Sequence, residues 1–499
     1  MQIDYLGHSE FVVTIKNSNN EDVRIMSDAW LSNYSFWDMM ERNPKIDLDH
    51  SKFEKIDAIF ISHAHVDHFD PYTFIELHDN LKNTPVLLIP NTISYLTPLL
   101  DKYLPKWEYK ILKSKTEIEI KWIKIYPLVF NNTYITNEDD VMTIWIYNDK
   151  EVVYTEVDTL PSDTVDAQSV LHALFTRRKF ESVIYLSTRN ELEWNLWMLD
   201  FNTLRERESF IQNYLQTREW EIAWQYEKFD YEDYNFKDIT KIKNFMRIFV
   251  GQWIVYPRVI NSEIGQIKVL PLNELVKLEK KIAKNYWRND YLMDFFEAWK
   301  EYQTENWKLK FIWDSKYISK IDFDDRKPNR KLEIFREFKN LPLNNEKRDH
   351  KIQEDIILDL LNNRFLGYYL WNTENNLKNA LLNWDYIIKV KYGFDNEYIV
   401  KYYKFGFGDM KFEELISKNE KQVYNEDYYA NDIEDFFNWK QELYSNFLHK
   451  LEKWKSYRFW NVLWVNFLNN DLIYKKMSLH FKRAYENKSV DEYVLNYYK

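Results

Sequence analysis

The fold of this chain is decided by the stretch Ala58-Ile59-Phe60-Ile61-Ser62-His63-Ala64-His65-Val66-Asp67-His68. Its first four residues are all apolar, as expected of a strand that is buried on both faces of a sheet. His63 and His65 follow, and because residues two apart in extended backbone point to the same side, both imidazoles can reach one ion at roughly 2 Å. Asp67 and His68 lie in the next turn and offer a second set of ligands. The pattern therefore predicts a metal site at the end of a buried strand, with room for two adjacent ions.

A helix is signalled directly after the histidines. Asp70 is the expected N-cap, Pro71 stands at the first helical position, and Phe74, Leu77 and Leu81 fall on one face. Strands are expected at residues 11–15, 23–27, 58–62, 86–89, 118–125, 142–146, 152–155, 182–187 and 246–250. This alternation of strands and helices predicts an α/β fold.

The chain of 499 residues is too long for one compact core, and its pattern changes along its length. After about residue 265 come helical segments rich in Lys, Glu and Trp, a predicted hairpin of strands at 386–392 and 398–405, and a helical tail from residue 433. We therefore expect a metal-binding domain over residues 1–265. A C-terminal, mostly helical and aromatic-rich α+β extension over residues 266–499 is expected to cover the site.

The composition limits the chemistry and the partners. The chain has no cysteine, so any metal must be held by histidine, carboxylate or carbonyl groups. The formal net charge of −11 repels a phosphate backbone over most of the surface, so we expect no nucleic-acid partner. The N-terminus is acidic where a signal peptide is basic, and no apolar run approaches the roughly 18 residues that span a membrane. A cytoplasmic protein without a membrane partner is therefore expected.

The histidine motif, with Gly7-His8-Ser9 and Asp28-Ala29-Trp30-Leu31 upstream of it, resembles the metallo-β-lactamase superfamily. The run from Tyr5 to Phe11 is similar to the ascorbate-6-phosphate lactonase-like branch. The motif, the VDT at 157–159 and the tail at 469–474 also resemble the non-Rieske part of the CMP-N-acetylneuraminate hydroxylase family. The resemblance implies an αββα sandwich with His63, His65, Asp67 and His68 as metal ligands and Asp158 as a carboxylate shared by two ions.

Two departures from that superfamily stand out. The hydroxylase family carries a Rieske iron–sulfur domain, and this chain starts directly at the metallo-β-lactamase-like region. Further histidine ligands are also missing, because there is no histidine from residue 79 to 171 or from 173 to 349. Asn131, Asn132 and the loop 137–140 can supply oxygen ligands instead, although the loop pattern favours a solvated acidic turn. His172 lies in a helical pattern and is favoured as a helix-face residue rather than a ligand.

Three residues are candidates for substrate binding. His8 precedes the strand expected at 11–15 and is expected to orient a ligand or substrate rather than to bind metal. Arg189 and Glu191 follow an apolar strand, where α/β proteins place substrate-contacting loops. Arg189 can grip a phosphate or carboxylate, and Glu191 can ligate metal or act as a base. Helix capping and a surface ion pair explain these two residues equally well.

The sequence leaves three functions open. The first is a hydrolase of an ester, lactone or phosphoester, in which Asp67 helps to ligate or position a metal-activated water. The second is a non-heme iron oxygenase or oxidase that takes electrons from a separate redox partner protein. The third is a binding or assembly module with a decayed metal site. For the first, which we favour, we expect a small-molecule substrate and one or two divalent ions, zinc or manganese, with iron also possible.

Overall fold

The computed structural model describes most of the first 160 residues and separate segments of the rest. The described residues are 1–32, 34–35, 40–42, 45–65, 67–129, 141–157, 180–188, 245–250, 254–255, 281, 293–295, 300–305, 308–322, 347–365, 385–394, 397–406, 411–416, 422, 424, 426–437 and 470–486.

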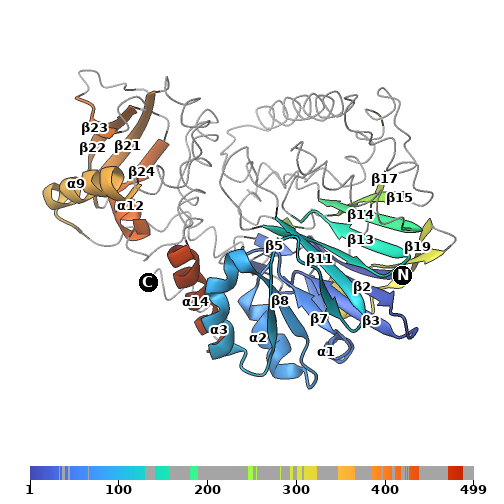
Figure 1. The fold of residues 1–499 in the computed structure, drawn as a ribbon. Coiled ribbons are helices and arrows are strands. Elements are labelled where there is room, and N and C mark those ends of the chain that lie inside the picture. Colours follow the sequence, from blue (N-terminus) through green and yellow to red (C-terminus); the bar gives the residue numbers. More distant parts are fainter. Residues whose placement is uncertain are drawn as a thin grey trace.

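Two large mixed sheets form the centre of the molecule (Figure 1). In spatial order, the first sheet consists of β19 (Lys308–Asp314), β18 (Lys300–Glu305), β1 (Gln2–Gly7), β2 (Glu10–Lys16), β3 (Asp22–Ser27), β7 (Ala58–Phe60), β8 (Val86–Pro90) and β9 (Tyr109–Leu112). The second consists of β10 (Ile118–Ile120), β11 (Ile123–Val129), β12 (Met142–Tyr147), β13 (Glu151–Thr155), β14 (Ser182–Thr188), β15 (Phe245–Val250) and β17 (Met293–Phe295). Pairing changes from antiparallel to parallel at β3 in the first sheet and at β13 in the second.

The two sheets pack face to face around a shared apolar core. Side chains from both sheets, among them Val13, Val153 and Ile184, belong to one buried cluster. The backbone N–H of Met142 donates to the carbonyl of Ser62 at 3.0 Å and joins the sheets at one edge. The predicted α/β sandwich is therefore confirmed. The helices expected over the second sheet fall within residues 158–179 and 189–244, outside the described residues.

Most of the predicted strands are present, but one segment differs. The single strand expected at 118–125 is wrong, because β10 and β11 form a hairpin there. Lys121 and Trp122 make the turn with φ values of 48° and 70°. Positive φ at both central residues matches the twist of a tight hairpin, which Gly or Asn usually provides. Neither is present here, so the sequence does not signal the turn.

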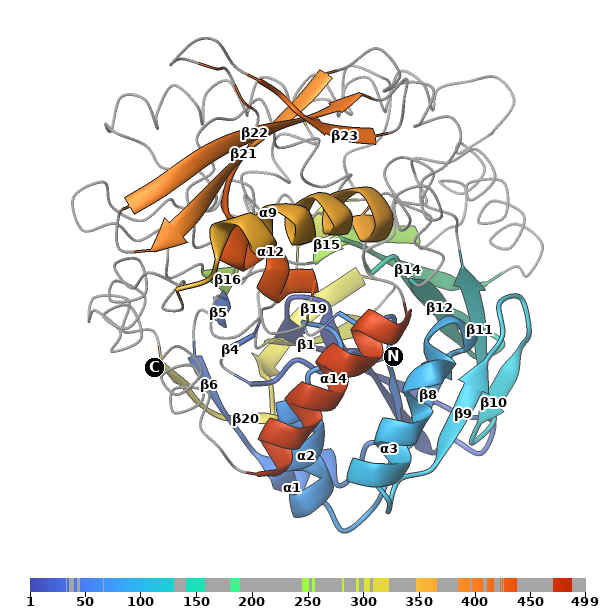
Figure 2. The same ribbon diagram turned by 90° about the vertical axis from the view of Figure 1, so that its left-hand side faces the viewer.

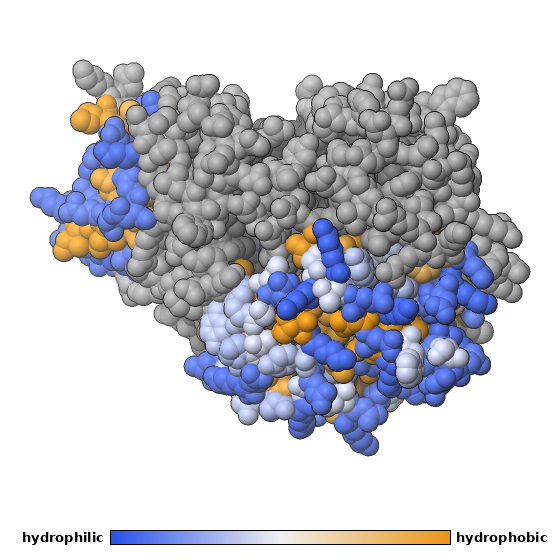
Figure 3. Space-filling view, viewed as in Figure 1, coloured by the Kyte–Doolittle hydropathy of each residue, from blue (hydrophilic) through white to orange (hydrophobic). Residues whose placement is uncertain are grey.

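Three helices cover the outer face of the first sheet: α1 (His50–Phe53), α2 (Pro71–Asn80) and α3 (Thr97–Tyr103), the last preceded by the short helix η1 (Asn91–Leu96). The predicted cap of α2 is confirmed, since the Asp70 side chain accepts from the backbone N–H groups of Tyr72 and Thr73. Burial raises the pKa of Asp70 to about 6. The hydrogen bonds that the carboxylate accepts, including those from Thr73, lower the pKa but do not offset the effect of burial. Figure 3 shows hydrophilic side chains around much of the rim of the described N-terminal part and hydrophobic side chains nearer its centre.

Thr73 ties the start of α2 to the chain that follows β3. Its Oγ1 donates to Asp70 Oδ2 at 2.6 Å. The same oxygen accepts from the backbone N–H groups of Leu31 and Ser32, at 2.8 and 3.0 Å. One hydroxyl therefore joins the helix to the loop that carries Asp28.

Two smaller groups of strands belong to the described N-terminal region, and strands after residue 265 also take part in its sheets. β16 (Ile254–Val255), β5 (Met40–Arg42) and β4 (Tyr34–Ser35) form a small sheet, and β20 (Ile318–Asp322) pairs with β6 (Lys45–Leu48). β17 pairs with β15, β18 with β1 and β20 with β6, and β19 extends the first sheet beyond β18. That the C-terminal extension begins near residue 266 stays a prediction. The buried carboxylate of Asp4 in β1 accepts from the Ser315 hydroxyl at 3.2 Å and lies 3.7 Å from Lys316 Nζ. These two contacts hold the segment that follows β19 against β1.

The last part of the chain has its own sheet, with strand order β23 (Lys411–Glu414), β22 (Glu397–Gly406), β21 (Asp385–Phe394) and β24 (Glu426–Tyr429), and the helices α9 (His350–Asp359), η6 (Leu360–Phe365) and α12 (Ala430–Phe437). The predicted hairpin is confirmed as β21 and β22. The helix α14 (Asn470–Tyr485) instead runs along α2 and α3 (Figure 2). Its Phe481 stacks on Tyr103 at 5.5 Å and meets Phe69 edge-on at 5.6 Å. That the extension covers the metal edge stays a prediction.

No helix within the described ranges is both long and apolar enough to span a bilayer.

The hydroxyl of Thr73 is expected to be essential for the loop between β3 and α2. Thr73→Val keeps the shape but removes the acceptor of two backbone N–H groups, and each such loss costs about 1–3 kcal/mol. Urea unfolding should therefore show a loss of roughly 2–6 kcal/mol for Thr73→Val. Thr73→Ser keeps the hydroxyl and removes one methyl group, so it should cost only about 1 kcal/mol. Equal costs for the two variants would contradict this role.

Candidate metal centre

The loop after β7 folds back on itself and gathers its polar side chains. The backbone N–H groups of His68 and Phe69 both donate to the carbonyl of His65, at 3.0 and 2.7 Å. His63, His65, Asp67 and His68 consequently share one tight turn at the carboxyl end of β7.

Asp28 lies against this turn and is fully buried. Its Oδ1 accepts from the backbone N–H of Ser62 at 2.7 Å. Its Oδ2 is 3.0 Å from both the Ser62 hydroxyl and Nδ1 of His68. The backbone N–H of Asp28 donates to the Phe60 carbonyl at 2.8 Å, and its φ is 44°, a conformation that aspartate tolerates better than most residues. Asp28 thus joins the ends of β3 and β7 and contacts a candidate ligand.

These hydrogen bonds determine which ring nitrogen of each histidine carries the proton. A carboxylate only accepts, so His68 donates to Asp28 from Nδ1. Ser62 donates its single hydroxyl hydrogen to Asp28, so it accepts from Nδ1 of His63, at 2.9 Å. Nε2 of each neutral ring then has a lone pair to offer, the usual state of a metal-binding histidine whose other nitrogen is hydrogen-bonded.

Four imidazoles lie within one small volume. The ring centroids of His63 lie 4.3 Å from those of both His65 and His68, and the His8 ring lies 4.9 Å from that of His68. His8, His63 and His68 are buried, and His65 is half-buried. Imidazole nitrogens gathered this closely suit ligation of a cation.

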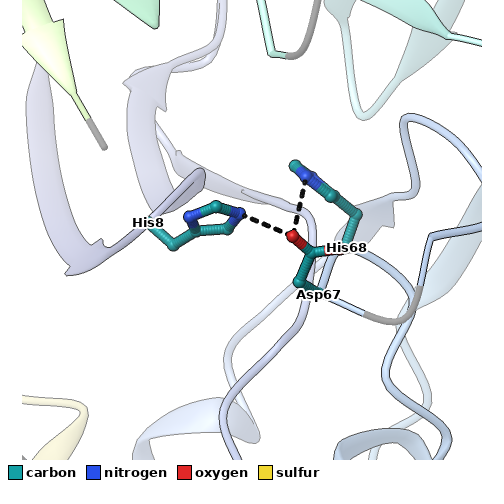
Figure 4. A group of neighbouring side chains, drawn as sticks. All are labelled: His8, Asp67 and His68. Atoms are coloured by element: carbon teal, nitrogen blue, oxygen red, sulfur yellow. Dashed lines mark ion pairs between the residues drawn. The ribbon is translucent and has the colours of Figure 1, made fainter. Parts of the chain in front are cut away.

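Asp67 contributes a carboxylate to this cluster. Its Oδ2 lies 3.3 Å from Nε2 of His8 and 3.8 Å from Nε2 of His68 (Figure 4). One possible ligand atom from each of these three residues lies within 4.8 Å of the other two. Imidazole nitrogen and carboxylate oxygen are donors that zinc, manganese and iron all accept. The residues present therefore fit a divalent cation.

The predicted bridging carboxylate, Asp158, lies outside the described residues, but the strand that leads to it is described. The start of β12 lies beside the end of β13, and Met142 in β12 donates to the carbonyl of Ser62 after β7. β7 and β13 therefore end at the same edge of the sandwich. Val157 has a φ of 53°, which is strained for a β-branched residue and marks a sharp turn just before residue 158.

A second buried carboxylate precedes that turn. Glu156 is fully buried and accepts a hydrogen bond from the Tyr185 hydroxyl of β14. Burial raises the pKa of the neighbouring Tyr154 well above its ordinary value, and the negative charge of Glu156 raises it further. The hydrogen bond between Glu156 and Tyr185 fixes the end of β13 to β14.

Several predicted site residues lie outside the described residues and stay predictions: Arg189, Glu191, His172, Asn131, Asn132 and the loop 137–140. His8 is the one predicted substrate-binding residue that the structure describes. It lies inside the histidine cluster rather than at its margin.

Sequence analysis assigned no role to Asp28 and Ser62. Their meeting depends on β3 and β7 being parallel neighbours, which no pattern in the sequence states. A signal was nevertheless present, because each polar residue directly follows an apolar strand. Polar groups at the carboxyl ends of parallel strands commonly line sites.

Comparisons with known proteins give fold-level likenesses only. No family model matches the sequence, and no curated protein matches it. Among solved structures, CmlA, a diiron β-hydroxylase from Streptomyces venezuelae, is 10% identical with a TM-score of 0.35, over 62% of this chain and 54% of that chain. The metallo-beta-lactamase fold protein YhfI from Bacillus subtilis is 11% identical with a TM-score of 0.32, over 60% of this chain and 99% of that chain.

Rm3 metallo-beta-lactamase is 10% identical with a TM-score of 0.19, over 37% of this chain and 77% of that chain. The chain spans about half the length of CmlA. Likenesses of this size carry no argument about chemistry. The α/β sandwich described above rests on the strand order and pairing of this chain itself.

Asp28→Asn is expected to weaken metal binding without unfolding the protein. An amide has one acceptor oxygen and an NH2 group in place of the second, so it cannot accept from both Ser62 and His68 as the carboxylate does. Loss of such a partner typically costs 10–100-fold in metal affinity, here about 30-fold. Chelator competition with zinc measures the dissociation constant. The matched control is Asp57→Asn, at the opposite end of β7, where the carboxylate accepts from the backbone N–H of Arg24 at 2.8 Å. Unchanged zinc affinity in Asp28→Asn would contradict the orienting role.

Proposed function

We propose that the protein is a metal-dependent hydrolase that acts on an ester, lactone or phosphoester. The observation that carries this proposal is the hydrogen-bond network of Asp28 and Ser62, which holds the rings of His63 and His68 through Nδ1, so that Nε2 is the nitrogen each would turn to an ion at one edge of the sheet. Burying polar groups in such a network requires removing them from water, which is unfavourable. A network that orients metal ligands explains why these groups are buried here.

In this proposal, each residue of the site has its own role. A divalent ion bound here would lower the pKa of a coordinated water to about 7 and polarise the substrate for attack. His63, His65 and His68 provide imidazole ligands, and Asp67 ligates or positions the attacking water. Asp158 is proposed as the carboxylate that links two ions.

Burial indicates the side from which a substrate arrives. His63 and His68 have no exposed surface, whereas His65 is half-buried and Asp67 keeps 7% of its surface exposed. A small-molecule substrate therefore approaches over His65 and Asp67. Arg189 and Glu191 remain proposed substrate contacts, because they follow β14, and β14 lies next to β13 in the second sheet.

The types of ligand present do not select one metal, and the identity of the metal separates two possible functions. A site of imidazole and carboxylate without thiolate accepts zinc, manganese or ferrous iron. With iron, the same residues would support an oxygenase or oxidase that depends on an external redox partner protein. Hydrolysis requires no electrons, and we therefore favour zinc or manganese.

Metal replacement tests this proposal. Protein stripped with chelator is reloaded separately with zinc, manganese and ferrous iron, then assayed on esters, lactones and phosphodiesters and for substrate-dependent oxygen uptake. We expect hydrolysis with zinc or manganese. His65→Ala should reduce it by roughly 100-fold or more, because the ion loses a direct ligand.

The control is His78→Ala, which removes a histidine of α2 whose Nδ1 lies 3.1 Å from Asp79 Oδ1, and it should leave hydrolysis unchanged. Oxygen uptake only with iron, lost in His65→Ala, would replace the hydrolase with the oxygenase. Silence in every assay, with no metal retained, would instead indicate a binding or assembly module.

A further inference from the structure

His8 is a buried histidine that the sequence places far from the metal-binding motif. It lies in the two-residue turn between β1 and β2, and only 1% of its surface is exposed. Its ring meets Trp30 edge-on at 5.6 Å and lies 4.9 Å from the ring of His68. The side chain is therefore fixed by packing and faces the candidate ligands.

Asp67 lies at distances from His8 and from His68 that are close to those between ligands of one ion, and the possible ligand atoms of all three residues lie within 4.8 Å of one another. Ligand atoms bonded at about 2.0–2.1 Å to a tetrahedral ion lie about 3.4 Å from one another. Nε2 of His8 lies 3.3 Å from Asp67 Oδ2, and the same oxygen lies 3.8 Å from Nε2 of His68. Small side-chain adjustments would bring all three atoms onto a shared cation.

The hydrogen bonds around His8 point to the same conclusion. Neither ring nitrogen of His8 makes a hydrogen bond within the described part of the chain, although both are buried. A buried polar atom without a hydrogen bond costs about 1–3 kcal/mol. Since Nδ1 of His68 donates to Asp28, its Nε2 presents a lone pair towards the Asp67 carboxylate. A cation beside Nε2 of His8, Asp67 Oδ2 and Nε2 of His68 would give the buried Nε2 of His8 a partner.

The backbone holds His8 in an unusual conformation. Its φ is 47°, and that of the preceding Gly7 is 102°. The Tyr5 hydroxyl donates to the His8 carbonyl at 2.9 Å within the protein interior. Strain that persists in a buried turn is typical of functional positions. The first hairpin of the chain is thus shaped to place this imidazole beside Asp67.

We propose that His8 is a direct metal ligand, and that His8, Asp67 and His68 hold a second ion next to the one bound by His63 and His65. This inference rests on the proposed metal-dependent function. It gives the second ion a nitrogen ligand from the N-terminal hairpin, in a chain without histidine between residues 173 and 349.

Zinc stoichiometry tests the assignment. The full-length protein is equilibrated with Zn²⁺ by dialysis, and bound zinc is measured by elemental analysis. We expect two ions per chain in the wild type and one in His8→Ala, with the dissociation constant of the second ion raised at least about 100-fold, beyond the effect of losing an outer partner of a ligand. His50→Ala is the matched control, because His50 pairs with Glu76 at 2.7 Å on the helical face, and it should keep two ions.

Two further variants separate ligation from simple misfolding. Tyr5→Phe removes only the hydroxyl that holds the His8 carbonyl, so the second ion should weaken by about tenfold while the first is unchanged. His8→Gln offers an amide oxygen at similar reach and should recover part of the lost affinity. In protein loaded with Co²⁺, His8→Ala should lose the visible absorption of one of the two ions and keep that of the other.

The outcomes distinguish this inference from the proposed function. Two zinc ions in His8→Ala with unchanged affinity would overturn the ligand role of His8. One ion in both wild type and His8→Ala would also overturn it, while the proposed hydrolase would survive with a single ion. No bound metal in the wild type would overturn both.

Discussion

The carboxylate of Asp28 is the interaction on which the site depends. It accepts from the backbone and the hydroxyl of Ser62 and from His68, all without access to water. Burying a carboxylate is unfavourable unless hydrogen bonds replace its hydration, and three donors do so here. The same bonds hold the end of β3 against the end of β7 and fix the ring orientation of two histidines. Structural support and ligand geometry are therefore one network.

The candidate ligands reach this network from segments that are well separated in sequence. The turn at His8 joins β1 to β2, Asp28 follows β3, and the histidine motif follows β7. These strands are consecutive neighbours in the first sheet. Since β1 runs parallel to β3 and β7, their carboxyl ends meet at one edge. The described part of the centre is thus built within the first 68 residues, and the second sheet supplies the strand end that precedes residue 158.

The outer layer stabilises this edge from behind. The Thr73 hydroxyl binds two backbone N–H groups of the loop after Asp28, so α2 and that loop cannot move independently. Phe69, directly after His68, packs against Phe481 of the C-terminal helix α14. A segment more than 400 residues away in sequence therefore contacts the residue next to a candidate ligand. Rigid support of this kind is what a metal centre needs to keep its ligands in place.

The sequence by itself determined the local features of this protein. Apolar strands, the cap of α2 at Asp70 and the spacing of the histidine motif are short-range patterns, and they predicted an α/β fold with a metal site at the end of a buried strand. The family resemblance of the motif implied the sandwich. The hairpin turn at Lys121 and Trp122 was missed because neither residue favours positive φ, so the surrounding pairing imposes it. The tertiary structure alone decided that Asp28 and Ser62 hydrogen-bond to the candidate ligands His68 and His63 and that His8 lies beside Asp67. Those contacts require strands far apart in sequence to be neighbours, and strand order follows from burial of the whole core rather than from any local pattern.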